Sequence, residues 1–311
     1  MNLKHGSPGK RDEKRMRANQ EELIDRIEEI LQNDGSIEPL SGLHLARISS
    51  PQEPLHGVFK PTLCIIAQGS KEVIFGDNRY HYDPFNYLLV AVDLPTITHV
   101  LDASEETPYI SVSMELSSTL VGSMIVKSGY TTPPRNSDKR AISVSPMDVN
   151  LQDAVLRLVR LLETPDEAET LVPLISREII YRLLRGDQGG RLSYLALTGG
   201  YAPDIAEAVE QLRQNYDQQI RMEDLASELG MSVSGFHHQF KEATAMSPLQ
   251  FQKQLRLQEA RRLMLSEDLD AASAGFRVGY QDASHFSREY KNLFGNPPIR
   301  DIQRLREETL S

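Results

Sequence analysis

The stretch LASELGMSVSGFHHQFKEATAMSP, residues 225–248, recurs in altered form about fifty residues later as ASAGFRVGYQDASHFSREYKNLFGNPP, residues 272–298. With one extra residue allowed in the second copy, positions of similar character coincide: Gly230 with Gly279, Phe236 with Phe286, Phe240 with Tyr290, Lys241 with Lys291, and Pro248 with Pro298. Each copy has a short apolar-faced segment, a glycine, a capping residue and a second helical segment. This order predicts two helix-turn-helix units.

The turns and caps of both units follow from residue type. Gly230 and Gly279 are placed to end the first helix of each unit, because glycine tolerates the left-handed backbone common at helix ends. Ser232 and Asp282 are placed to cap the second helices. Gly275 lies inside a predicted helix, where it costs about 1 kcal/mol relative to alanine. Its presence predicts that a neighbouring helix passes very close.

The second helix of each unit has an apolar and a polar stripe at helical spacing. The apolar stripes are Phe236 and Phe240 in the first unit and Phe286, Tyr290 and Leu293 in the second. The polar stripes repeat at the same offsets: Ser234, His237, His238 and Lys241, then Ser284, Ser287, Arg288 and Lys291. A polar stripe on one helix is usually a solvated face, but its duplication in this context favours two recognition helices.

The segment between the two units, from Pro248 to about Leu265, is predicted to form one helix, with a proline suited to its first turn. A helix of that length spans roughly 27 Å. Once helix widths are added, such a rod places the two recognition helices in successive major grooves, about one turn of roughly 34 Å apart.

The net charge of −10 argues against a nucleic-acid partner at first sight, because phosphates are contacted by lysine and arginine. From residue 201 onward there are thirteen Lys or Arg and seventeen Asp or Glu. The segments 232–262 and 276–306 nevertheless hold more basic than acidic residues. We therefore predict modest non-specific affinity for DNA and a strong need for contacts to base edges.

The N-terminal half has a different texture. Residues 1–19 are basic and polar and are predicted to be a disordered tail. Residues 20–31 have helical spacing, and residues 43–116 form short β-rich runs typical of a barrel or jelly roll. Gly76-Asp77-Asn78 indicates a hairpin, and Asp83-Pro84 indicates another turn. Two amphipathic segments after Ser145 are predicted to form a helical hairpin that pairs with a second copy of the chain.

These patterns predict an α+β protein: an N-terminal cupin-like β-barrel with flanking helices, then an all-α domain with two helix-turn-helix motifs joined by a long helix. The predicted boundaries are 20–186 for the first domain, 187–200 for a glycine-containing linker, and 201–311 for the second domain. No apolar run approaches the roughly 20 residues of a membrane span, and no secretion signal opens the chain. The expected setting is cytoplasmic.

A metal or redox site is not predicted. Cys64 is the single cysteine, which excludes an internal disulfide framework, and its apolar neighbours favour a buried structural thiol over a sensor. The histidines of the first half are scattered, with no H-x-H motif followed by an acid: His44, His56, His81 and His99. We therefore expect no metal, no cofactor and no enzymatic activity.

Residues 222–306 resemble the double helix-turn-helix domain of the AraC/XylS family of bacterial transcription regulators, through the glycine turn, F-S-R-x-[FY]-K and G-x-x-P of the second copy. The N-terminal half resembles one subgroup through short motifs: Gln68-Gly69-Ser70-Lys71, Gly76-Asp77, Tyr82-Asp83-Pro84 and Val92-Asp93-Leu94-Pro95. The resemblance implies an effector-sensing or dimerising N-terminal domain and a C-terminal domain that binds promoter DNA and usually activates transcription. It implies as partners a small-molecule effector, a second copy of the chain and RNA polymerase.

Carried over to this sequence, the family's base-reading positions fall on Ser234, His237 and His238 in the first unit and on Ser284, Ser287 and Arg288 in the second. Lys241 and Lys291 would contact phosphate. The Arg288 guanidinium suits the O6 and N7 atoms of guanine. The first unit departs from the common pattern at Ala245, where the second has Gly295, and at Gly235 within the helix.

Two alternatives remain open from the sequence. Asp282, Ser284 and His285 are the residue types of a hydrolytic triad, and the cupin-like half could belong to an enzyme. Adjacent helical residues do not face each other, however, and a triad needs its histidine between nucleophile and acid. The repeats could also form a module that binds only other proteins. The role of His285 is left open.

Overall fold

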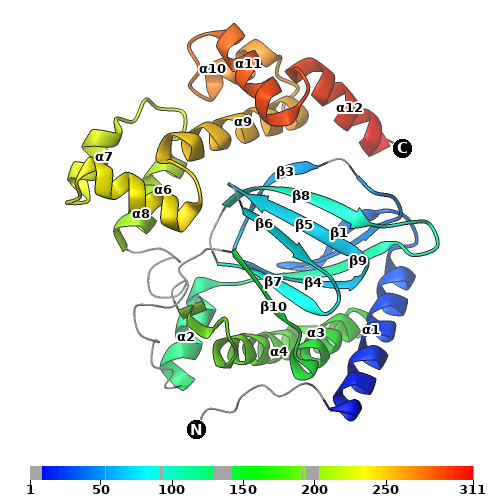
Figure 1. Ribbon diagram of the computed structural model, residues 1–311. Helices are drawn as coiled ribbons and strands as arrows, with labels where there is room; N and C mark the ends of the chain where they lie inside the picture. Colours follow the sequence, from blue (N-terminus) through cyan, green and yellow to red (C-terminus); the bar gives the residue numbers. More distant parts are fainter. Residues whose placement is uncertain are drawn as a thin grey trace.

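The computed structural model describes residues 9–52, 54–76, 78–91, 94–128, 142–190, 192–193 and 203–310. Figure 1 shows a β-rich N-terminal domain with helices on one side and the helical C-terminal domain on the other. The expected α+β architecture is confirmed. Asp77 of the predicted hairpin, and Val92 and Asp93 of the last subgroup motif, lie outside the described residues.

Among the described residues, ten antiparallel strands build the first domain: β1 (Gly35–Leu40), β2 (Leu43–Ile48), β3 (Leu55–Phe59), β4 (Thr62–Gln68), β5 (Ser70–Phe75), β6 (Asn78–Tyr82), β7 (Asn86–Val90), β8 (Leu94–Asp102), β9 (Tyr109–Glu115) and β10 (Ile142–Pro146). The hairpin of β5 and β6 and the turn at Asp83 both occur where predicted. Buried apolar side chains of both sheets form the core, including Leu45, Val73 and Leu88.

The predicted cupin-like β-barrel takes the form of two separate sheets that do not close into a barrel. One sheet has the strand order β1-β2-β9-β4-β7-β10 and the other β3-β8-β5-β6. The chain passes from the first sheet to the second at Gly69, whose φ of +83° suits glycine. Any Cβ there would lie 2.4 Å from the carbonyl oxygen of Asp102. This corner sends β5 away from β4, and the outer strands of the two sheets share no ladder, so the barrel does not close.

Helices cover the six-stranded sheet (Figure 1): α1 (Lys10–Ile30), α2 (Ser118–Ser128), α3 (Val149–Arg160) and α4 (Pro165–Arg185). Helices α3 and α4 form the predicted helical hairpin, joined by a short 3-10 turn at Leu161–Glu163. Leu23 and Ile27 of α1 are buried in the core. Arg160 of α3 donates two hydrogen bonds to Glu22 of α1, at 2.8 and 2.6 Å. These contacts lower the pKa of Glu22 to about 2.

The predicted disordered tail was wrong from Lys10 onward, where α1 begins. Met16 packs against the core, and the Gln20 side chain donates a 2.9 Å hydrogen bond to the carbonyl oxygen of Ala67. Residues 10–19 therefore form the first part of α1, and the contact of Met16 with the core is not evident from their polar composition. Residues 1–8 lie outside the described residues.

The predicted linker at 187–200 also needs correction in its first half. Gln188, Leu192 and Ser193 are buried. Ser143 of β10 donates a 2.5 Å hydrogen bond to the Gln188 side chain, which in turn donates to Ser145. Gln188, Leu192 and Ser193 therefore pack on the first domain, and the glycine pair at 189–190 does not mark a boundary. The rest of the predicted linker lies outside the described residues.

The second domain contains α6 (Pro203–Gln214), α7 (Met222–Glu228), α8 (Val233–Thr244), α9 (Pro248–Ser266), α10 (Ala271–Arg277), α11 (Ala283–Phe294) and α12 (Pro298–Leu310). Helices α7 and α8 form the first helix-turn-helix, and α10 and α11 form the second. Helix α9 is the predicted connector, and it contributes to both cores: Phe251 packs with the first unit, and Leu257 and Ala260 pack with the second.

A buried ion pair closes the second unit. Arg261 of α9 donates two hydrogen bonds to Asp301 of α12, at 2.8 and 2.9 Å, and Asp301 is fully buried. The Tyr290 hydroxyl of α11 donates to the same carboxylate at 2.8 Å. One acid thus connects three helices of the second unit.

The prediction for Gly275 is confirmed: a Cβ there would lie 2.8 Å from the Cγ atom of Phe286 in α11. The two turn glycines differ in their surroundings. Gly230 has a φ of +66° with open space at its Cβ position. Gly279 has a φ of +90°, and a Cβ there would lie 1.9 Å from the carbonyl oxygen of Asp217.

Alanine at the two turn glycines should therefore have unequal costs. We expect Gly230→Ala to cost about 1–2 kcal/mol from the left-handed backbone alone. Gly279→Ala adds a backbone clash and should cost about 3 kcal/mol or more. Urea unfolding monitored by circular dichroism measures both values. Equal costs would show that the close approach at Asp217 is absent.

Candidate nucleic-acid interface

Both recognition helices begin at the predicted caps. The Ser232 hydroxyl accepts a 3.2 Å hydrogen bond from the Gly235 amide at the start of α8. The Asp282 carboxylate accepts a 2.5 Å hydrogen bond from the His285 amide at the start of α11. The left-handed position after α8 is taken by Ala245, with a φ of +53°. Gly295 takes the corresponding place after α11, so the sequence departure at Ala245 leaves the helix end unchanged.

The apolar stripes point inward as predicted, with Phe236, Phe240, Phe286 and Tyr290 fully buried. Phe294 completes the second stripe, whereas Leu293 is only half-buried. The polar stripes lie on the accessible side: Ser234, His238, Lys241, Ser284, Arg288 and Lys291 are exposed, and His237 and Ser287 are half-buried. Each candidate side chain can thus be contacted by a ligand that binds to this face of its helix.

Most of the positively charged side chains in the second domain form ion pairs with acidic residues. Eight of its thirteen Lys and Arg residues form ion pairs with acids: Arg213, Arg221, Lys253, Arg261, Arg262, Arg277, Arg304 and Arg306. Arg256 instead donates to the carbonyl oxygens of Tyr216 and Gln218. Within residues 203–310, the cations without an acidic partner are Lys241, Arg288, Lys291 and Arg300.

Three of these four cations lie on the two recognition helices. An unpaired cation is free to meet a phosphate or a base edge without first losing an ion pair. Arg300 is the fourth, in the first turn of α12, and the sequence patterns assigned it no role. In the sequence, only its position just after Pro297 and Pro298, where the second unit ends, distinguishes Arg300.

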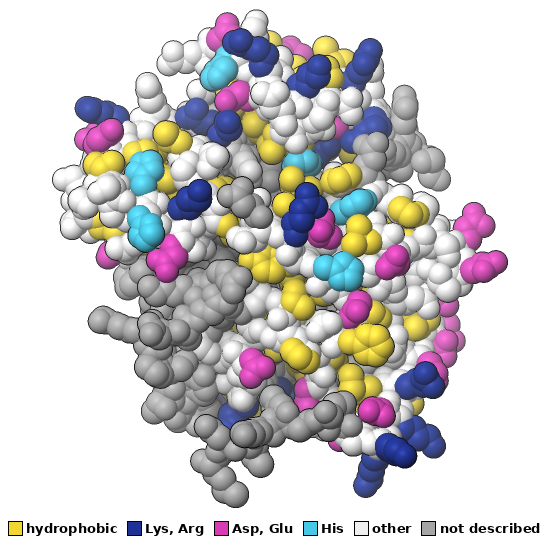
Figure 2. All heavy atoms as spheres, in the orientation of Figure 1, with side chains coloured by type: hydrophobic (Ala, Val, Ile, Leu, Met, Phe, Trp, Pro, Cys, Tyr) yellow, Lys and Arg dark blue, Asp and Glu magenta, His cyan; other side chains and the backbone are white. Residues whose placement is uncertain are grey.

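The first recognition helix borders an open hollow of about 410 Å³, lined by His237, His238, Lys241, Glu242 and Ser247. Figure 2 shows histidine side chains exposed on the surface over α8, with acidic and basic side chains nearby. The acid Glu242 weakens the positive potential of this hollow.

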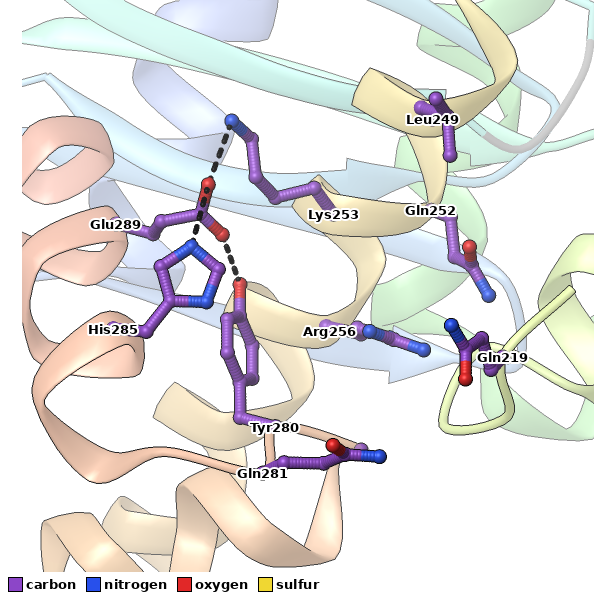
Figure 3. A pocket seen from close by; sticks show the side chains of 10 residues that line it. Gln219, Leu249, Gln252, Lys253, Arg256, Tyr280, Gln281, His285 and Glu289 are labelled. Carbon is purple, nitrogen blue, oxygen red and sulfur yellow. Dashed lines mark hydrogen bonds and ion pairs between the residues drawn. The ribbon is translucent and has the colours of Figure 1, made fainter.

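His285 has a defined place between α11 and α9 (Figure 3). Its Nε2 atom lies 3.7 Å from the Glu289 carboxylate, and its ring lies edge-on to Tyr280, with 5.6 Å between centroids. Glu289 also accepts a 2.8 Å hydrogen bond from the Tyr280 hydroxyl and pairs with Lys253 of α9 at 3.2 Å. These groups border a cavity of about 300 Å³ between the second unit and α9.

Asp282, Ser284 and His285, which are close in the sequence, do not form a hydrolytic triad in the structure. Asp282 caps the helix through a backbone amide, and the His285 side chain turns toward Glu289. Burial and the Glu289 carboxylate raise the pKa of the Tyr280 phenol, so this hydroxyl stays protonated and holds the turn before α11 to that helix, while Lys253 links Glu289 to α9. The cluster therefore positions the second recognition helix.

The first domain contacts both helix-turn-helix units. The Gln258 side chain of α9 donates a 3.1 Å hydrogen bond to the carbonyl oxygen of Gly57 in β3. The His56 ring lies edge-on to Phe294 of α11, with 4.8 Å between centroids. At the hairpin of β5 and β6, a Cβ on Gly76 would lie 2.3 Å from the carbonyl oxygen of Ala245. The four-stranded sheet thus contacts the connector and one end of each recognition helix.

Comparison with known proteins agrees with this architecture. Residues 39–191 match the family described as AraC-type transcriptional regulator N-terminus, and residues 225–304 match a helix-turn-helix domain. The chain belongs to the AraC family. The two matched segments correspond to the β-rich domain and to α7 through α12.

Relatives of this AraC-family chain are named transcriptional regulators. It is 26% identical over 154 residues to the HTH-type transcriptional regulator ArgR of Pseudomonas aeruginosa, covering 49% of this chain and 47% of that protein. It is 26% identical over 176 residues to the HTH-type transcriptional activator RhaS of Escherichia fergusonii, covering 53% and 58%. The chain thus matches about half the length of these curated relatives.

Solved structures of ToxT from Vibrio cholerae share the fold. An apo ToxT structure aligns with a TM-score of 0.55 at 13% identity, covering 87% of this chain and 97% of that one. A ToxT structure with a bound unsaturated fatty acid aligns with a TM-score of 0.53 at 12% identity, covering 87% and 95%. At this identity the likeness concerns the fold alone.

The structure of this AraC-family chain also bears on Cys64, on metal ligands and on membrane-spanning helices. Cys64 is buried as expected, and burial raises the pKa of its thiol to about 11, which keeps the thiol unreactive. Among the described residues, no three His, Cys, Asp or Glu side chains gather in a way that would hold a metal ion. No helix in the described part of the chain has the length and apolar character to cross a membrane.

The contact between His56 and the second unit should depend on pH. Burial and the nearby Arg261 lower the pKa of His56 from 6.5 to about 4, while Asp301 opposes the shift weakly. The docked imidazole is therefore neutral, and its stabilising effect is complete above pH 6.5 and is lost progressively as the pH falls toward 4. The loss should be roughly 1–3 kcal/mol, since one pKa unit corresponds to about 1.4 kcal/mol.

Thermal unfolding between these pH values tests this expectation. The melting temperature of the wild type should fall more steeply with decreasing pH than that of His56→Gln, which cannot titrate. His81→Gln, which changes an exposed histidine of the same sheet, should keep the wild-type slope. Identical slopes in all three proteins would contradict the burial of His56 against α11.

Proposed function

We propose that this chain is a sequence-specific transcriptional regulator that reads two successive major-groove segments of promoter DNA and activates transcription in response to an effector. The observation that carries the proposal is the pairing of charges in the second domain. Most of its cations are neutralised by acids, whereas the recognition helices keep Lys241, Arg288 and Lys291 without an acidic partner among the described residues. The acidic net charge of the domain is thus compatible with DNA binding.

The exposed polar stripes supply the base contacts in this proposal. Ser234, His237 and His238 of α8 read one groove segment, and Ser284, Ser287 and Arg288 of α11 read the next. Arg288 is suited to guanine because its fork matches two adjacent acceptors. Lys241, Lys291 and Arg300 contact phosphates, which position the protein without carrying sequence information.

The connector determines the spacing between the two contacts. Helix α9 has 19 residues, which corresponds to about 28 Å. Its two ends are fixed to different units, so the recognition helices behave as one rigid reader. Successive major grooves on one face of DNA lie roughly 34 Å apart, a distance within reach once helix widths are added.

The first domain supplies the regulation in this proposal. It binds a small-molecule effector and pairs two chains through the helical hairpin, where Leu174 and Tyr181 of α4 expose apolar surface seven residues apart. Its contacts with α9 and with both units allow it to bias how they sit on DNA. Activation agrees with the name of the relative RhaS, and the fatty acid in the ToxT structure shows that a protein of this fold accepts a ligand.

Contact with RNA polymerase and action in the cytoplasm complete the proposed role, since promoter DNA and polymerase meet there. Selection of binding sites from random DNA by the full-length protein tests the role directly. The expected result is a site with two conserved segments. Absence of any sequence-selective binding at physiological salt would instead favour a module that binds other proteins.

On a selected site, three alanine variants should behave differently. Arg288→Ala should cost about 1–3 kcal/mol and relax specificity at one base position. Lys291→Ala should weaken binding to all sequences alike and reduce the slope of log affinity against log salt by about 1. Arg277→Ala is the matched control, because this arginine pairs with Glu267 away from the polar stripes and should leave binding unchanged. Gel-shift titrations at several salt concentrations measure all three.

If Arg288→Ala and Lys291→Ala both leave the footprint and the salt slope untouched, α11 is not a recognition helix. If Arg277→Ala weakens binding as much as Lys291→Ala, the distinction between paired and unpaired cations is wrong.

A further inference from the structure

We propose that Lys71 anchors the carboxylate of a small organic effector between the two sheets of the first domain. The inference deepens the proposed regulatory function, on which it rests, by assigning a residue and a ligand class to the effector site. Lys71 belongs to the Gln68-Gly69-Ser70-Lys71 motif, for which neither the DNA-binding surface nor the contact between domains has a use.

The position of Lys71 is unusual for a lysine. Side chains alternate along β5, and Lys71 shares its face with Val73 and Phe75, which are 0% and 2% exposed. Its Nζ atom lies 5.7 Å from the ring centroid of Phe59 in the four-stranded sheet and 5.9 Å from that of Tyr109 in the six-stranded sheet. The ammonium is therefore flanked by one aromatic ring from each sheet.

This ammonium has no counter-charge among the described residues. Of the neighbouring acids, Glu72 pairs with Arg79, and Asp102 accepts a hydrogen bond from Ser70 and forms no ion pair with Lys71. The faces of two aromatic rings attract a cation, but a charge partly removed from water is normally matched by an opposite charge. Lys71 is only half-buried, so part of its surface remains accessible to solvent.

The surroundings select the kind of anion. Tyr82 is hydrogen-bonded to Cys64 and Tyr109, and all three side chains are buried. Burial raises the pKa of Tyr82 and of Cys64, so both groups stay uncharged beside Lys71. One free cation neutralises one negative charge, which favours a carboxylate over a phosphate dianion. The rings of Phe59 and Tyr109 offer apolar surface for the carbon skeleton that carries the carboxylate.

The rest of the motif holds Lys71 in place. The Gln68 side chain donates a 2.9 Å hydrogen bond to the carbonyl oxygen of Pro108, just before β9. Gly69 makes the close corner against Asp102, and Ser70 donates to the Asp102 carboxylate. The start of β5 is therefore fixed to β8 and β9, as a ligand anchor requires.

A ligand at Lys71 would touch the strands that contact the second domain. Phe59 lies in β3, the strand whose Gly57 accepts from Gln258 of α9. Lys71 lies in β5, the strand that ends at the hairpin seated against Ala245. Ordering of these two strands by a bound anion provides a direct route to both helix-turn-helix units.

Thermal-shift and calorimetric titrations of the full-length protein with hexanoate, decanoate and benzoate test the assignment. Hexanamide, decanamide and benzamide serve as uncharged partners of nearly equal shape. We expect at least one carboxylate to raise the melting temperature of the wild type and to bind at least about tenfold more tightly than its amide. This comparison needs no variant, so it does not depend on how a substitution folds.

Three variants identify the anchor. Lys71→Met should abolish the preference for acid over amide, Lys71→Arg should retain it, and Lys127→Met, which changes an exposed lysine of α2, should bind like the wild type. Without ligand, Lys71→Met should melt no lower than the wild type, because it removes a charge that lacks a counter-charge.

Equal binding of acids and amides, no stabilisation by any of the three carboxylates, or wild-type acid binding by Lys71→Met would each overturn the assignment. A large loss of stability in Lys71→Met without ligand would also overturn it, since the ammonium would then be structural. The titrations contain no DNA. Failure of the proposed function would appear separately, as absence of selective DNA binding by the wild type.

Discussion

Helix α9 contributes side chains to the cores of both helix-turn-helix units, and the spacing of the two recognition helices depends on this shared burial. Phe251 enters the first core, and Leu257 and Ala260 enter the second. Polar contacts also fix the middle and the C-terminal half of this helix: Arg256 donates to the carbonyl oxygens of Tyr216 and Gln218, and Arg261 is paired with the buried Asp301. A helix anchored in this way cannot change the distance between the units without breaking buried contacts.

The first domain contacts the same helix and can influence the second domain there. Its contact through Gly57, the contact of His56 with Phe294 and the hairpin at Gly76 together reach the connector and an end of each recognition helix. A rigid reader with one correct arrangement can be controlled by small changes at such contacts, because packed interfaces switch between discrete arrangements. The four-stranded sheet thus lies between the proposed effector site and the proposed DNA-binding surface.

Local features of the second domain were predictable from the sequence because they depend on near neighbours. The glycine turns, the caps at Ser232 and Asp282, and the accessible polar stripes all follow from residue type and helical spacing. Even the close approach at Gly275 was indicated by the cost of glycine in a helix. The roles of the stripe residues in DNA binding remain predictions.

Features that depend on distant partners were not predictable. Counting charges could not separate paired from unpaired cations, because Arg261 and Asp301 are forty residues apart and Arg306 pairs with Asp268. Likewise, Met16 and Gln188 are ordered by contacts with remote strands, so a polar tail and a glycine-rich linker were predicted where packed segments exist. The division of the strands between two sheets was not predictable either, because it depends on pairings between strands far apart in the chain, such as β2 with β9.

In the proposed complex, α9 holds the two recognition helices at one fixed spacing on DNA. Insertions between the two conserved segments of a selected site, followed by gel-shift titration of the full-length protein, test this claim most directly. Inserting about 5 base pairs turns one segment to the opposite face of the helix, and inserting about 10 restores the face but not the distance. A rigid connector predicts that both insertions abolish the contribution of the displaced segment, whereas recovery with the longer insertion would contradict it.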